Sequence, residues 1–145
     1  MSSVPARFAI DANVILRGLL LDNRELSDKA IAILKAVEEG RSAVYCDPVT
    51  LAEVVWVLWR SYQRSRQDIA SALKPIVQAE GFHMPGKDRY LRALDLYGTT
   101  VEHFGDACAC AGALEECEGK LCSFDRKLSS VPGVERLEQA RADRR

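Results

Sequence analysis

The sequence predicts an α/β fold, a three-layer α/β/α sandwich built around a short and mostly parallel sheet. Short apolar segments rich in strand-forming residues alternate with longer segments whose apolar residues recur at helical spacing. This alternation favours parallel pairing, because parallel strands require crossover connections, which helices provide. A length of 145 residues with 48% hydrophobic residues predicts one domain over residues 1–145, with a core over about 7–137 and a solvated C-terminal tail.

The first half of the chain contains two predicted strands, each followed by a helical segment. RFAI predicts a buried strand that leads directly into Asp11. LSDKAIAILKAVEEG predicts a helix with Ser27 as its N-cap and Gly40 as its stop. SAVYC predicts the second strand, and Asp47 followed by Pro48 is typical of the start of a helix, here running through VTLAEVVWVLWRSYQ.

The second half of the chain is predicted to be mainly helical. Ser65 and Asp68 indicate the start of a helix through IASALKPIVQAEG, which Pro75 is expected to kink or divide. After a short extended piece, FHM, the segment KDRYLRALDLYG predicts a helix that Gly98 ends. Another helix is expected over about 104–118.

Two aspartates are expected at the same edge of the sheet. KLCSF predicts a strand followed by Asp125, as RFAI is followed by Asp11, and SVPGVERL predicts a turn into a last small strand. Ligands of open parallel sheets bind beyond the carboxyl ends of the strands. Two carboxylates there would repel each other unless a positive charge lay between them. Hard oxygen ligands without a histidine cluster favour Mg²⁺ or Mn²⁺.

Two further acids, Glu53 and Asp106, are expected at the starts of neighbouring helices. Each also has a purely structural interpretation. Thr50 and Glu53 match a capping box, in which the glutamate binds a backbone amide. Asp106 suits an N-cap or the first turn of a helix, where the helix dipole favours an acid. Because all four acids would meet at one edge of the sheet, we favour a shared metal site.

Charge and cysteine content exclude other classes of protein. The net charge of -1 gives no general attraction to a polyanion, so contacts to nucleic acid must be local. No signal segment or membrane-spanning run is visible, which predicts a cytoplasmic protein without a membrane partner. Five cysteines predict reduced thiols, and Cys108 and Cys110 lack the spacing of a zinc knuckle.

Four segments together resemble the acidic blocks of PIN-domain nucleases. They are FAIDANVILRGL, TLAEVVWVL, HFGDACACAGAL and SFDRKLSSVPGVERL, and the resemblance runs from Arg7 to about Leu137. It implies a metal site made by Asp11, Glu53, Asp106 and Asp125, with Asn13 and Ser123 as polar supports. Members often have Thr or Ser at the position of Ala12 and acids at those of His103 and Lys127, so a second metal ion or an auxiliary acid is not implied.

The resemblance is greatest to the VapC-type toxins of bacterial toxin–antitoxin pairs. It implies Mg²⁺- or Mn²⁺-dependent hydrolysis of RNA to a 5′-phosphate and a 3′-hydroxyl, and an antitoxin protein as partner. Arginines near the site are expected to contact RNA phosphates: Arg17, Arg60, Arg64, Arg66 and Arg126. A solvated helix face explains each arginine equally well.

One helix is expected to contact a partner. The stretch from Val54 to Trp59 is apolar on every side, which predicts a homodimer or another partner surface, or else a central helix covered by its own chain.

Two other functions stay open for the protein. One is an inert PIN-like module that binds RNA or protein. The other is an aspartyl phosphatase of the haloacid dehalogenase type, which would require an acid where this chain has Asn13.

Overall fold

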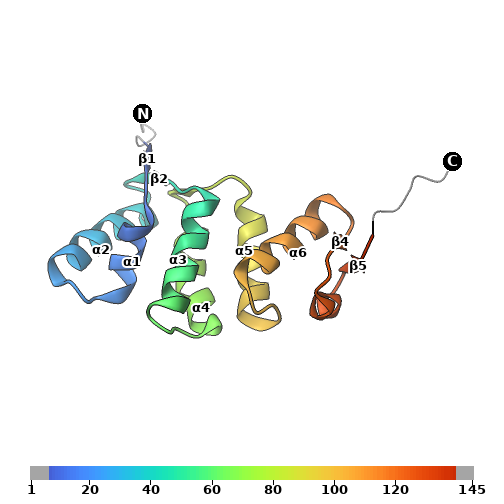
Figure 1. Cartoon of the computed structure of the whole chain (residues 1–145). Helices are drawn as coiled ribbons and strands as arrows, with labels where there is room; N and C mark the ends of the chain where they lie inside the picture. The colour runs from blue at the N-terminus through green and yellow to red at the C-terminus, as the bar shows by residue number, and fades with distance from the viewer. Residues whose placement is uncertain (1–6, 140–145) are drawn as a thin grey trace, which may run out of the picture.

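The computed structural model describes residues 7–139, and it confirms the α/β/α class and the parallel pairing of the strands (Figure 1). Three strands form one sheet in the order β1-β2-β3: β1 (Arg7–Ala9), β2 (Ala43–Tyr45) and β3 (Phe82–His83). Two others form a second parallel sheet: β4 (Lys120–Cys122) and β5 (Glu135–Leu137). The expectation of a single sheet was therefore wrong, since β4 does not pair with β1.

Helices α3, α5 and α6 lie between the two sheets, and α1 and α2 lie beside the first one (Figure 1). They are α1 (Ala12–Leu20), α2 (Arg24–Glu38), α3 (Pro48–Arg60), α4 (Arg66–Gln78), α5 (Lys87–Thr99) and α6 (Phe104–Glu116), with a 3₁₀ turn η1 (Arg126–Ser130). The closest packing joins α4 to α5, α5 to α6 and α1 to α2. In Figure 1, β4 and β5 lie beyond α6 at one end of the molecule, whereas β1 and β2 lie above α1, between α2 and α3.

Two helix starts agree with the sequence prediction, and a third does not. The Asp47 side chain accepts a hydrogen bond from the Val49 amide at 2.8 Å, and Ser65 accepts from the Asp68 amide at 3.1 Å. Ser27 is not an N-cap, because α2 begins at Arg24 and Asn23 accepts the capping bond. Ser27 instead lies buried within α2.

Helix α1 was not predicted from the sequence. Pro75 and Gly98, which were expected to interrupt or end helices, lie within α4 and α5. Asp11 caps α1 by accepting from the Val14 amide at 3.1 Å. Helix α4 continues through Pro75, because proline removes only one backbone bond while buried residues on either side, such as Leu73 and Val77, hold the helix in the core. Gly98 does not end α5, which continues to Thr99.

The core consists of side chains from the helices and from the β1-β2-β3 sheet. Its fully buried members include Ile15, Leu51, Val54, Ile69, Leu73, Phe82, Leu94 and Cys110. Among residues 7–139, none of the helices combines the length and the apolarity that crossing a membrane requires. The solvated tail expected at the C-terminus falls largely on residues 140–145, which lie outside the described residues.

At Gly98, α5 packs closely against Ala70 of α4, so a larger side chain there should destabilise the fold. A Cβ at position 98 would lie 2.9 Å from the Cβ of Ala70. We expect Gly98→Val to lower the free energy of unfolding by about 1–3 kcal/mol, measured by urea denaturation. Gly112→Ala is the matched control, because its Cβ would meet nothing within 4 Å. It should raise the free energy of unfolding by roughly 0.5–1 kcal/mol. Equal effects at both positions would contradict this.

Candidate functional site

Glu53 does not cap its helix. Helix α3 begins at Pro48 with Asp47 as N-cap, so Glu53 lies in the second turn, beyond the reach of a capping box with Thr50. Its side chain is exposed and lines a groove between α3 and the turn that leads into α6. The structural interpretation of Glu53 was therefore wrong, and its carboxylate is available for other contacts.

The groove beside Glu53 has a volume of 590 Å³ and combines acidic with aromatic side chains. It is lined by Val49, Ala52, Glu53, Val55, Trp56, Trp59, Tyr97, Glu102, His103, Phe104 and Gly105. Trp56 and Trp59 are 59% and 44% exposed, whereas Val54, Val55 and Leu58 of the same helix are buried. One face of α3 is therefore covered by the rest of the chain, and the opposite face is exposed. Trp56 and Trp59 are three residues apart, a spacing that places both on one face of a helix, so the sequence could have indicated this exposed face.

Asp106 and Asp125 both influence the same buried cysteine, Cys110. Asp106 is half-buried in the first turn of α6, and Asp125 caps η1 by accepting from the Lys127 amide at 3.0 Å. Burial raises the pKa of the Cys110 thiol, and the negative charges of Asp106 and Asp125 raise it further. Both carboxylates therefore act on the same buried thiol. The ion pair between Lys127 and Glu102 at 3.6 Å also joins η1 to the start of α6.

The loop that carries Asp125 is held by short polar contacts. Ser123 accepts a hydrogen bond from the Asp125 amide through Oγ at 3.0 Å, and its carbonyl oxygen accepts one from Arg136 at 2.9 Å. Ser123 thus supports the loop rather than contacting the carboxylate itself.

Asp11 lies in a different groove, at the end of β1. This groove has a volume of 550 Å³ and is lined by Phe8, Ala9, Ile10, Asp11, Val14, Ala32, Ile33, Ala36, Ser42 and Val44. Asp11 is exposed, and its neighbour Asn13 is exposed in the first turn of α1. The apolar lining indicates a surface that another element could cover.

The four predicted acids are thus only partly brought together. Among residues 7–139, no three His, Cys, Asp or Glu side chains are close enough to hold a metal ion. The reason is topological, because Asp11 follows β1 and Asp125 follows β4, and these strands belong to separate sheets. The carboxylate oxygens suit Mg²⁺ or Mn²⁺ chemically.

The predicted arginines do not share one rim. Arg60 and Arg64 line a groove of 330 Å³ together with Trp59 and Gln63. Arg17 forms an ion pair with Asp22 at 2.6 Å. The other two lie elsewhere: Arg66 is half-buried at the start of α4, and Arg126 is exposed in η1.

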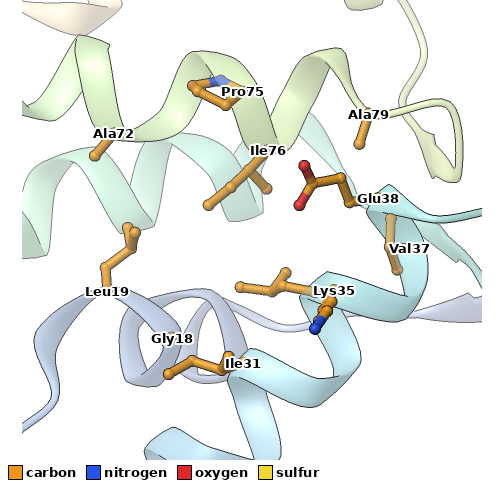
Figure 2. A pocket seen from close by; sticks show the side chains of 11 residues that line it. Gly18, Leu19, Ile31, Lys35, Val37, Glu38, Ala72, Pro75, Ile76 and Ala79 are labelled. Atoms are coloured by element: carbon orange, nitrogen blue, oxygen red, sulfur yellow. The ribbon is translucent and has the colours of Figure 1, made fainter.

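A further groove lies between α4 and the α1–α2 pair (Figure 2). It has a volume of 380 Å³ and is largely apolar, with Leu19 and Ile76 on opposite sides. The Glu38 carboxylate points into it (Figure 2). None of the four predicted acids lines this groove, so it contributes nothing to a metal site made by them.

Comparison with known families gives one match over most of the chain. The PIN domain model matches residues 8–134, a range that includes all four acids. A search of the curated proteins found no match to the chain.

The cysteines should divide into two classes by reactivity. Burial raises the pKa values of Cys46 and Cys108 to about 11, and the charge of Asp47 adds to the effect at Cys46. Iodoacetamide at pH 8 should therefore modify the exposed Cys117 and Cys122 first, as followed by peptide mass spectrometry. Rapid modification of Cys46 in the native protein would contradict this burial.

The same two thiols predict how stability depends on pH. The folded-state pKa values lie above the ordinary 9.0, so ionisation opposes folding. This contribution to stability is complete below pH 9 and should be lost as the pH rises toward 11, measured by urea denaturation. Cys46→Ser with Cys108→Ser should reduce the pH dependence in this window.

Proposed function

This chain belongs to the PIN domain family, and we propose that it is a metal-dependent endoribonuclease. PIN domains are generally metal-dependent nucleases. The observation that supports the proposal best is that the family match includes Asp11, Glu53, Asp106 and Asp125. The exposure of Glu53, which caps nothing, adds to this support.

The proposed roles follow from the chemistry of the four carboxylates. Asp11 and Asp106 would bind Mg²⁺ or Mn²⁺ directly, and Glu53 or Asp125 would orient the attacking water or accept its proton. When bound, such a cation supplies a water of lowered pKa and neutralises charge on the phosphate oxygens. The products would be a 5′-phosphate and a 3′-hydroxyl. Ser123 would act as a support by fixing the Asp125 loop.

We also propose where RNA would bind. Trp59 lines both the groove of Arg60 and Arg64 and the groove of Glu53, so the two grooves adjoin. The arginines would contact phosphates, and the exposed tryptophans would stack on unpaired bases. Arg126, next to Asp125 in the chain, would contact phosphate from the other side, whereas the ion pair to Asp22 makes Arg17 a weaker candidate.

The finer proposal is that the protein acts as the cytoplasmic toxin of a toxin–antitoxin pair. The antitoxin would place an amphipathic segment on the exposed apolar face of α3, and one of its basic side chains would pair with Glu53 or Glu102. A segment bound there would cover part of the proposed RNA-binding grooves, and this would account for inhibition. An inert RNA-binding or protein-binding module is the alternative, and it would bind without cleavage.

Cleavage of RNA should depend on a divalent metal ion and on the carboxylate of Asp11. Purified protein should cut single-stranded RNA with Mg²⁺ or Mn²⁺ and lose this activity in excess EDTA. Asp11→Asn should lower the rate at least about 100-fold. Stability should change little, because asparagine also accepts the capping bond of α1.

The matched control is Asp28→Asn, which removes an exposed acid from α2. It should leave the cleavage rate and the urea midpoint unchanged. Full activity of wild-type protein in EDTA, or of Asp11→Asn with metal, would contradict the proposal.

The exposed face of α3 should contribute to antitoxin binding. Trp56→Ala should weaken inhibition by an antitoxin encoded beside this gene at least about tenfold, because aromatic anchors dominate such interfaces. Binding is measured by calorimetry with the co-purified partner. Val49→Ala, also exposed in this groove, is a control for loss of apolar area and should have a smaller effect. An unchanged affinity with Trp56→Ala would place the antitoxin elsewhere.

A further inference from the structure

The groove of Glu53 presents aromatic side chains to solvent on a surface that the core holds in place. Trp56 and Trp59 of α3 line it and are 59% and 44% exposed. Tyr97 and Phe104 also line it but are buried, and their rings pack edge to face with their centroids 5.8 Å apart. Core packing therefore fixes the inner part of the groove, while the tryptophans remain available to stack on a planar ligand.

An ion pair lies on the wall of this groove that precedes α6. Glu102 lines the groove, and the Nζ atom of Lys127 in η1 lies 3.6 Å from its carboxylate. The two side chains are 57% and 75% exposed, so their attraction contributes little to stability. Both groups can therefore bind a ligand in place of each other. Together they present two acceptor oxygens next to an ammonium donor.

This arrangement of acceptors and donor matches the Watson–Crick edge of guanine. Among the four RNA bases, only guanine has two adjacent donors on this edge, N1–H and the N2 amino group, which the two oxygens of one carboxylate can accept side by side. Its O6 atom, next to N1, can accept a hydrogen bond from the Lys127 ammonium. Adenine, cytosine and uracil each offer one donor group on this edge and therefore lack the second hydrogen bond to Glu102.

We propose that the groove of Glu53 binds an unpaired guanine of single-stranded RNA, which stacks on the exposed tryptophans and pairs with Glu102 and Lys127. The guanine must be unpaired, because base pairing would occupy the edge that these two side chains contact. This inference rests on the proposed function, since the bound guanine would then determine where the RNA is cut.

The ion pair is close in sequence to two of the proposed catalytic acids. Glu102 precedes Asp106 by four residues. Lys127 follows Asp125 by two residues. The adjoining groove, which contains two arginines, would hold the phosphates that flank the bound base. A guanine in the groove of Glu53 would therefore position a neighbouring phosphodiester near these acids.

Guanine binding can be measured without cleavage, because the chain has two tryptophans, Trp56 and Trp59, and both line the groove. In excess EDTA, a short oligouridine with one central guanosine should quench the tryptophan fluorescence. Adenosine at that position should weaken binding at least about tenfold. Inosine, which lacks the N2 amino group, should weaken it at least about threefold. Equal affinities for the three oligonucleotides would overturn the proposal. An absence of quenching would also overturn it, and this is the result expected if the groove binds only a protein.

Substitutions of the ion pair test which side chains read the base. Glu102→Gln replaces one acceptor oxygen with a donor at nearly constant size, and it should reduce the preference for guanosine over adenosine at least about fivefold. Glu25→Gln is the matched control, because Glu25 forms a similarly exposed ion pair with Lys29 at 3.5 Å, on a helix that does not line the groove. It should leave the preference unchanged. A wild-type preference in folded Glu102→Gln, with folding checked by circular dichroism, would overturn the proposal.

Cleavage products distinguish a failure of this proposal from a failure of the proposed function. If the protein cuts RNA, sequencing of the new 5′ ends should place the cuts beside unpaired guanosines, and Glu102→Gln should distribute them over other bases. Cuts without a preference for guanosine would overturn the guanine site and leave the nuclease function intact. If the protein cuts no RNA, the nuclease function fails, while the fluorescence measurements still decide whether guanine is bound.

Discussion

The strand pairing determines whether the two predicted acids that follow strands, Asp11 and Asp125, can meet at one edge of a sheet. In a parallel sheet the carboxyl ends of all strands face one edge, so residues that follow different strands meet only if those strands belong to the same sheet. Asp11 and Asp125 each follow a strand, and these strands are in separate sheets. Asp106 and Glu53, which belong to helices, are fixed by core packing instead and do not depend on this pairing.

The core explains why the helical part is fixed while the sheet is divided. Helices α3 to α6 contribute buried side chains such as Leu51, Leu73, Leu94 and Cys110, which determine their mutual positions. β1 and β4 contribute little to this core, because most of their residues are exposed. The relative position of β1 and β4 is therefore determined less by core packing than the positions of the helices are.

Local signals in the sequence predicted most elements but not how the strands assemble. The caps at Asp47 and Ser65 were readable because a side-chain oxygen next to a helical pattern has a specific backbone partner. Gly98 was misread as a stop, because its role is a contact with α4, which is distant in sequence. The division of the strands into two sheets has no local signature either, since three-residue strands carry too little pattern to specify a neighbour.

The same distinction applies to the candidate site. The four acids could be chosen from the sequence, because strand ends and helix starts recur in a pattern that resembles the family. The exposed face of α3 could be anticipated from the apolar stretch that contains Trp56 and Trp59, but the groove itself could not, because its other wall comes from residues 102–105, which are distant in sequence. Like charges disfavour bringing Asp11 to Asp106 and Asp125, so a site shared by these acids would require a cation between them.

The most direct test of the account is a titration of the apo protein with Mn²⁺, followed by electron paramagnetic resonance of the free ion. The account predicts saturable binding that is lost in both Asp11→Asn and Asp125→Asn and retained in Asp28→Asn. Wild-type binding that survives the loss of Asp11 would contradict a metal site that includes this acid.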